Sequence, residues 1–140
     1  MDTNSTALSV KTAVDAPLEK VWTYWTDPKH IMQWYKASAE WHAPYAQNEL
    51  SQGGTFKTTM AAKDGSFQFD FEGYYTNILD QERIEYTLAD GRKVRIDFVG
   101  EGDQTNIIQR FETENTHPVE VQQQGWQAIL NSFKHYTENN

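Results

Sequence analysis

The side chains best able to do chemistry in this sequence are four histidines and a large set of carboxylates. The histidines, His30, His42, His117 and His135, are far apart, and none lies in an H-E-x-x-H or similar metal-ligand spacing. The chain has no cysteine, which excludes disulfides, thiolate metal sites and cysteine nucleophiles. We therefore expect no metal site and no cofactor.

Catalysis would need a positioned acid or base, and the best candidates are Tyr86, His42 and Glu40. Each also has an ordinary structural interpretation, Tyr86 as a core tyrosine with a satisfied hydroxyl and His42 as a surface histidine. No G-x-S-x-G motif is present, and Gly53-Gly54 is too short for a phosphate-binding loop. These residues form no catalytic constellation, so the sequence names no catalytic residue and favours a protein that is not an enzyme.

The size and charge of the chain restrict its class. Its 140 residues suit one domain with a full hydrophobic core. The formal net charge of −8 argues against a nucleic-acid partner, because nucleic acids attract basic surfaces. No apolar run approaches the ~20 residues of a membrane helix, and residues 1–10 lack the basic and apolar regions of a signal peptide. We expect one domain over residues 1–140, with its core at about 8–137, in a cytoplasmic monomer or weak dimer without membrane insertion.

The N-terminal third predicts a strand and two short helices. Apolar and polar side chains alternate over residues 8–14, which is typical of a strand with one buried face. Asp15 and Asp27 are the expected N-caps of two helices, with Pro17 and Pro28 in their first turns. The buried face of the first helix is expected to carry the residues at i, i+3, i+4 and i+7, namely Leu18, Val21, Trp22 and Trp25.

The pattern fades between residues 36 and 51 and then changes to a period of two. Long irregular segments in compact domains are often binding loops or lids, although an ordinary surface loop fits equally well, and we expect a loop here. The later segments 55–60, 66–75, 83–88, 94–100 and 105–112 predict strands that each have one apolar and one charged face. Such one-sided strands are typical of an antiparallel sheet. The expected inward residues are Phe56, Thr58, Met60, Phe67, Phe69, Phe71, Ile84, Tyr86, Leu88, Val94, Ile96, Phe98, Thr105, Ile107, Gln109 and Phe111.

A last helix follows Pro118, which we expect in its first turn, with Asn115 or Thr116 near the cap. Its apolar stripe spans an arc of about 120° and should pack on the inner face of the sheet. The stripe consists of Trp126, Ile129, Leu130, Phe133 and Tyr136.

Three residues near this stripe raise specific questions. Gln122 lies within the arc, and Gln109 lies at an inward strand position. An unpaired buried amide costs about 1–3 kcal/mol, so each should have a partner in the backbone, a water molecule or a ligand. Gly125 costs a helix about 1 kcal/mol relative to alanine. We expect its missing side chain to let the helix approach a neighbouring element closely.

Several motifs resemble a known family. They are, in order, "APLEKVWTYWTDPKHIMQWY", "GGTF", "DGSFQFDFEGYYTNI", "ERIEYTLADGR" and "GWQAILNSFKHY". The chain resembles, from about Val10 to Tyr136, the heat-shock-protein-90 ATPase activator homologue-like family of the START-like (SRPBCC, Bet v-type) superfamily. The resemblance implies an α+β helix-grip fold: a curved antiparallel sheet of six or seven strands around a long C-terminal helix, with two short helices after the first strand and a deep cavity between sheet and helix.

The resemblance leaves the function open, because this superfamily includes carriers, enzymes and co-chaperones on one scaffold. We favour binding or transport of a small hydrophobic or aromatic ligand, such as a lipid, a sterol or a polyketide-like molecule, in that cavity. The alternatives are a chaperone or stress-response partner and an enzyme of the polyketide cyclase or aromatase type. Trp34 and Trp41 are expected at the mouth, and Thr58, Gln109 and Gln122 as polar anchors. The expected wall is Phe56, Met60, Phe69, Phe71, Tyr86, Phe98, Phe111, Trp126, Ile129, Leu130 and Phe133.

Overall fold

The computed structural model describes residues 7–140. Residues 1–6 lie outside this range. They belong to the expected domain and to the N-terminal segment in which we expect no signal peptide. The elements of the described chain, in order, are β1 (Ala7–Val14), α1 (Leu18–Thr26), α2 (Pro28–Trp34), β2 (Trp41–Asn48), β3 (Thr55–Ala62), β4 (Gln68–Leu79), β5 (Arg83–Leu88), β6 (Lys93–Glu101), β7 (Gln104–Glu112) and α3 (Val119–Glu138).

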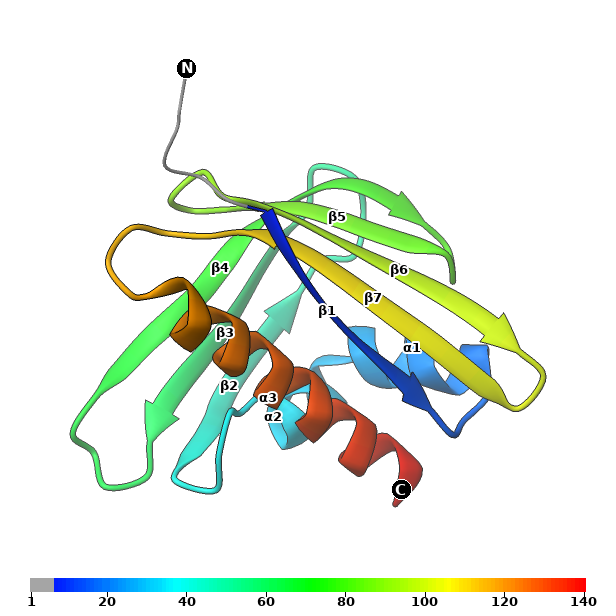
Figure 1. Cartoon of the computed structure of the whole chain (residues 1–140), viewed down its shortest axis with the longest axis horizontal. Helices are drawn as coiled ribbons and strands as arrows, with labels where there is room; N and C mark the ends of the chain where they lie inside the picture. The colour runs from blue at the N-terminus through cyan, green and yellow to red at the C-terminus, as the bar shows by residue number, and fades with distance from the viewer. Residues whose placement is uncertain (1–6) are drawn as a thin grey trace.

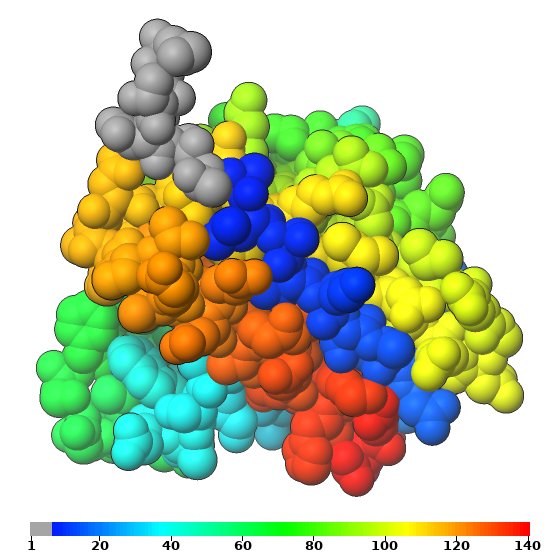
Figure 2. Space-filling view, in the orientation of Figure 1, coloured from blue at the N-terminus to red at the C-terminus, as the bar shows by residue number. Residues whose placement is uncertain are grey.

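The strands form one antiparallel sheet in the order β1-β7-β6-β5-β4-β3-β2. Figure 1 shows the sheet curling around α3, while α1 and α2 close the opposite end. Figure 2 shows α3 running along this face between β1, in blue, and the cyan and green segments that include β2 and the β3–β4 hairpin. This arrangement confirms the predicted α+β helix-grip fold, with seven strands.

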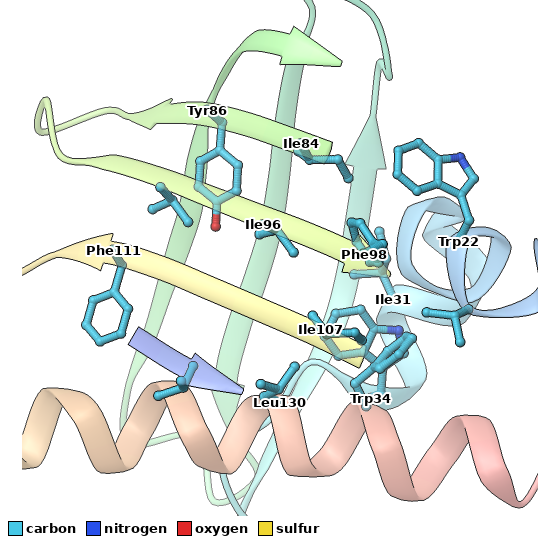
Figure 3. Close-up of a cluster of buried hydrophobic side chains, with 14 of the residues drawn as sticks. Trp22, Ile31, Trp34, Ile84, Tyr86, Ile96, Phe98, Ile107, Phe111 and Leu130 are labelled. Atoms are coloured by element: carbon cyan, nitrogen blue, oxygen red, sulfur yellow. The ribbon is translucent and has the colours of Figure 1, made fainter. Parts of the chain in front are cut away.

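The core lies between the sheet and the helices. Every expected inward residue of β5, β6 and β7 is buried, as the period of two predicted. Figure 3 shows Ile96 and Phe111 pointing from the sheet toward α3, Leu130 pointing back from the helix, and Phe98 lying beside Trp22 of α1. The largest fully buried side chains also include Trp34 and Phe133.

One of the three predicted helix caps is confirmed. The side chain of Asp27 accepts a hydrogen bond from the backbone N–H of Lys29 at 2.9 Å, at the start of α2. The prediction for Asp15 is wrong: α1 begins after Pro17 without a side-chain cap. The reason is tertiary, because the intervening Ala16 is buried and its carbonyl accepts a hydrogen bond from the Thr105 hydroxyl at 2.9 Å.

The start of α3 also differs from the expectation. Its N-cap position is Pro118, so neither Asn115 nor Thr116 caps the helix, and no side chain does. The segment before the helix is held instead by the side chain of Gln122, as described below.

The expected loop at 36–51 is wrong over half its length, because β2 occupies Trp41–Asn48. β2 is an edge strand that contains Pro44, and its pairing with β3 shifts register between His42 and Tyr45. Proline is tolerated in edge strands and at such irregularities, and both features destroy the period of two. Backbone pairing with β3 therefore forms this strand, rather than a side-chain pattern.

The tip of the β3–β4 hairpin also departs from the prediction. Phe67 lies before β4 and is 58% exposed, so the expected inward position is wrong, and Phe69 is 39% exposed. Phe71, further along β4, is partly buried against the core. This part of the sheet therefore extends past the area that the helix covers, and its aromatic side chains are left beside an open space.

Candidate functional site

A pocket of about 440 Å³ lies between the first half of α3 and strands β3 and β4, and it opens to solvent. Its position corresponds to the border of the orange part of α3 with the green and cyan segments in Figure 2. Most of its wall is apolar. The lining residues are Tyr35, Ala37, Trp41, Met60, Phe69, Phe71, Arg92, His117, Val121, Gln122, Gly125, Trp126 and Ile129.

Aromatic contacts fix two sides of this pocket. On the helix side, the indole of Trp126 stacks on Phe111 with ring centroids 4.4 Å apart and meets Phe71 edge-on at 6.0 Å. On the opposite side, Trp41 packs edge-on against Phe69 at 6.1 Å. Such contacts stabilise ring pairs by about 0.5–1.5 kcal/mol beyond the buried area. The pocket therefore has walls that are held in place without a ligand.

Gly125 faces this pocket, and the expectation that it brings α3 close to a neighbour is wrong. Apart from its chain neighbours and the backbone of its own helix, a Cβ atom built at this position meets nothing within 4 Å. The glycine therefore leaves space in the pocket and does not relieve a tight contact. Because glycine in the interior of a helix costs about 1 kcal/mol relative to alanine, this open position carries a cost in stability.

The two glutamines have structural partners. The Gln122 side chain accepts a hydrogen bond from the Glu114 N–H at 2.9 Å and donates to the carbonyls of Glu114, at 3.0 Å, and His117, at 2.8 Å. Backbone, one of the three partners we expected, is thus its partner, and the amide ties the segment before α3 to the helix. Gln109 is instead hydrogen-bonded to the hydroxyl of Tyr86.

Two basic side chains line the end of the pocket near the start of α3. Arg92, in the β5–β6 turn, donates from Nε to the Asp90 carboxylate at 2.8 Å. His117 lies 3.1 Å from Glu114 through its ring Nδ1, and its backbone N–H donates to the same carboxylate. Although burial acts in the opposite direction, the hydrogen bonds from His117 hold the pKa of Glu114 below its ordinary value. No carboxylate side chain lines the described wall of the pocket.

A second, much smaller void of about 40 Å³ lies deeper in the domain. Tyr35 and Phe71, whose rings are 5.6 Å apart, line both spaces and form a partition between them. At roughly 10–15 Å³ per water molecule, the void has room for about three waters. On its wall, Asn48 accepts a hydrogen bond from the hydroxyl of Tyr75 at 2.5 Å and donates to the Thr26 carbonyl at 2.6 Å.

Burial affects the tyrosines around this void. It raises the pKa of Tyr35, Tyr75 and Tyr86 well above the ordinary value of about 10. These phenols are therefore neutral hydrogen-bonding groups at neutral pH. Figure 3 shows the hydroxyl of Tyr86 directed into the interior of the domain.

The sixteen residues predicted to bind a ligand fall into three groups in the structure. The first group lines the large pocket: Trp41, Met60, Phe69, Phe71, Gln122, Trp126 and Ile129. The second lines the small void: Trp34, Phe56, Thr58, Tyr86 and, again, Phe71. The third lines neither space: Phe98, Gln109, Phe111, Leu130 and Phe133. Contact of any of them with a ligand stays a prediction.

Trp34 does not lie at a mouth. It is 1% exposed, its indole N–H donates to the Tyr24 carbonyl at 2.9 Å, and its ring packs edge-on against Phe133. Trp41, by contrast, does lie on the wall of the open pocket.

The sequence prediction missed six lining residues: Tyr35, Ala37, Arg92, His117, Val121 and Gly125. One signal could have found two of them. Val121, Gly125 and Ile129 are spaced at i, i+4 and i+8, so they form a second stripe beside the main apolar stripe of α3. Arg92 and His117 lie in connecting segments, where no periodicity indicates what a side chain faces.

The candidates for acid–base chemistry are not brought together. Glu40 and His42 are exposed near the start of β2, whereas Tyr86 is buried and bonded to Gln109. In the described residues, no three histidine, aspartate or glutamate side chains are grouped as metal ligands. The enzyme alternative thus has no residue set to test beyond these three separate side chains.

The curled seven-stranded sheet around a C-terminal helix, with an open pocket between them, defines a helix-grip domain of the START-like superfamily. A family model described as Activator of Hsp90 ATPase homolog 1-like protein matches residues 15–138. The chain belongs to this family. None of the proteins with curated functions matches it.

Solved structures support the same assignment. The AHSA1-like protein of Aeromonas hydrophila is 38% identical, with a TM-score of 0.90, over 96% of this chain and 93% of that one. A protein of Cytophaga hutchinsonii is 61% identical, with a TM-score of 0.80, over 94% of this chain and 92% of that one. A Nitrosomonas europaea protein, 16% identical over 99% and 97% of the two chains, shares the fold with a TM-score of 0.81.

Over residues 7–140, no helix combines the length and hydropathy needed to cross a membrane.

Proposed function

We propose that this protein binds or transports a small hydrophobic or aromatic molecule in the pocket between α3 and strands β3 and β4. The observation that carries the proposal is an open pocket of about 440 Å³ with a largely apolar wall, which a helix glycine enlarges. Ligand pockets of small-molecule binding proteins have volumes of about 300–1,000 Å³ and this kind of lining. Lipids, sterols and polyketide-like molecules are the candidate classes.

In this proposal the predicted residues have different roles. Those on the pocket wall, such as Met60, Phe71 and Trp126, contact the ligand. Those in the core, such as Phe111, keep the wall in position, since Phe111 supports the indole of Trp126 from behind. Gln122 acts on the ligand indirectly, because its amide is used to hold the segment before α3.

The proposal is tested by titrating the protein with lipids, sterols and flavonoids while recording tryptophan fluorescence, since Trp41 and Trp126 both line the pocket. In Gly125→Leu, a leucine side chain would project into the pocket and should abolish the fluorescence change. Gln124→Leu is the matched control, because it adds the same side chain at an exposed neighbouring position. No response to any compound, or equal responses in all three proteins, would reject the proposal.

A second candidate function, contact with a chaperone in a stress response, is favoured by the description of the family model. Exposed apolar side chains offer a surface for such a contact: Phe69 and Val121 on the pocket wall, and Phe67 next to Phe69. Capture experiments against purified Hsp90 separate the two functions. A chaperone contact would survive Gly125→Leu and be weakened by Phe67→Ser, whereas ligand binding should show the opposite pattern.

The proposal includes three further properties. The protein is taken to be cytoplasmic, to be a monomer or a weak dimer, and to bind neither nucleic acid nor the membrane interior. Light scattering coupled to size-exclusion chromatography measures the oligomeric state, and a stable dimer at micromolar concentration would contradict this part.

A further inference from the structure

The charges on the pocket wall differ from those of the chain as a whole. Asp and Glu number 20 in the sequence, against 12 Lys and Arg. The described wall of the pocket nevertheless carries Arg92 and His117 and no carboxylate. Each basic group is paired with a carboxylate that is not part of the wall, Asp90 and Glu114 respectively, so the wall itself favours a ligand group of negative charge.

The guanidinium of Arg92 is held in place by one hydrogen bond and has further donor groups without a partner in the described residues. Its Nε donates to Asp90 at 2.8 Å, and the side chain is 23% exposed. This is the one hydrogen bond that its guanidinium makes to the described part of the chain, so its two terminal nitrogens remain as donors. Asp90 therefore holds the group through Nε, and the two terminal nitrogens of this pocket-lining side chain are available to a second acceptor.

The charge of Arg92 also acts toward the interior. Burial raises the pKa of Tyr86, and the positive charge of Arg92 partly opposes this increase. The other polar side chains of the wall near Arg92 are already paired. Gln122 is bonded to backbone groups, and the ring of His117 is bonded to Glu114.

We propose, on the basis of the binding function proposed above, that the ligand is an apolar monocarboxylic acid whose carboxylate pairs with the terminal nitrogens of Arg92. Its hydrocarbon or aromatic part lies along Met60, Gly125 and Trp126. A guanidinium edge matches the two oxygens of a carboxylate and binds it through two parallel hydrogen bonds. A doubly charged head group such as a phosphate monoester is disfavoured, because the Asp90 carboxylate lies next to the same guanidinium.

The test compares decanoate with decanol, which share an alkyl chain and differ in the head group. Calorimetric titration at pH 7.5 should show decanoate binding about tenfold more tightly than decanol, since hydrogen bonds to charged groups are the strong ones. Arg92→Gln should weaken decanoate binding about tenfold and leave decanol binding within about twofold. Arg92→Lys, which keeps the charge and loses the paired geometry, should give an intermediate result.

Arg110→Gln is the matched control. It removes the same charge from the outer face of β7, where the side chain is 57% exposed and lies outside the pocket. Its affinity for decanoate should equal that of the unchanged protein. Thermal unfolding of each variant, with decanol binding as a second measure of folding, shows that the pocket is intact.

The results separate the two proposals. If decanol binds as tightly as decanoate and Arg92→Gln changes neither, the carboxylate inference is wrong and the binding function stands. If Arg92→Gln and Arg110→Gln weaken decanoate binding equally, the loss comes from the net charge of the protein, and the carboxylate inference is wrong. If neither compound binds and the wider ligand panel is also silent, both proposals are wrong.

Discussion

The substitution Gly125→Ala tests whether the pocket is open against α3, independently of any ligand. Gly125 lies inside a helix of 20 residues, and a Cβ at this position meets nothing within 4 Å beyond its chain neighbours and its own helix backbone. Alanine favours the interior of a helix by about 0.8–1.0 kcal/mol relative to glycine. Since the new methyl group stays in the open pocket, it adds little burial, and we expect a gain of about 1 kcal/mol in the free energy of unfolding.

This gain translates into a measurable change in melting temperature. The entropy of unfolding is about 2.1 cal/mol/K per residue, so 1 kcal/mol corresponds to roughly 3 °C for a chain of 140 residues. Urea titration at 25 °C measures the free energy, and calorimetry measures the melting temperature. Gly73→Ala is the control: its Cβ would lie 2.3 Å from the Thr87 carbonyl oxygen, and we expect a loss of several kcal/mol.

The result that would refute this reasoning is a loss of stability in Gly125→Ala. Such a loss would mean that α3 packs closely at this position in solution, as a helix contact through a glycine does. The pocket would then be closed where the structure has it open, and the proposed binding function would lose its main support.

Three further predictions concern buried polar groups. Burial raises the pKa of Tyr35, Tyr75 and Tyr86, so the free energy of unfolding that these neutral phenols contribute is complete below about pH 10. Above that pH it should decrease by up to about 1.4 kcal/mol per pH unit for each tyrosine. Urea midpoints from pH 8 to 11 measure this decrease, and a flat profile would contradict the prediction. Thr137→Val should raise the free energy of unfolding by about 1 kcal/mol, because the buried hydroxyl of Thr137 lacks a partner among the described residues; a loss in urea titration would show that a partner exists. Asn48→Ala should cost roughly 2–3 kcal/mol by removing its bonds to Thr26 and Tyr75, and unchanged thermal unfolding would show that these bonds are replaceable.

The strands whose inward residues could be predicted are those with one face completely covered by the helices. Tyr86, Ile96 and Gln109 all lie inward at positions given by a period of two, because β5 to β7 are flanked by strands and covered by helices. The edge strand β2 escaped prediction because Pro44 and the register shift beside it interrupt any alternation. The sequence pattern is informative where side-chain burial determines the strand, and much less so where backbone pairing does.

Helix starts follow the same rule. Asp27 caps α2 through a wholly local arrangement. Pro28 follows Asp27 directly, and the Asp27 carboxylate accepts a hydrogen bond from the backbone N–H of Lys29 in the first turn. Asp15 is separated from Pro17 by Ala16, and α1 begins only after Pro17, while Ala16 is buried and its carbonyl is bonded to Thr105. A local signal therefore predicts the cap only where no tertiary contact competes with it.

The composition of the pocket could be predicted only in part, because wall and core residues have the same pattern. Phe71 and Phe111 both occupy inward strand positions, yet Phe71 borders the pocket and Phe111 is covered by Trp126. The difference depends on how far α3 extends over the sheet, which periodicity does not encode. Arg92 was missed for another reason: a turn residue has no predictable facing direction until the fold places it.

One helix therefore serves two purposes along its length. In its second half, Leu130, Phe133 and Thr137 are fully buried, and the helix completes the core. In its first half, Val121 is exposed and Gly125 faces open space, so the helix there forms one wall of a pocket. Substitutions in the first half can change the size of the pocket without creating cavities in the core, because the two functions use different turns of the same helix. For this reason a change at Gly125 should alter the proposed ligand binding while the domain keeps or gains stability.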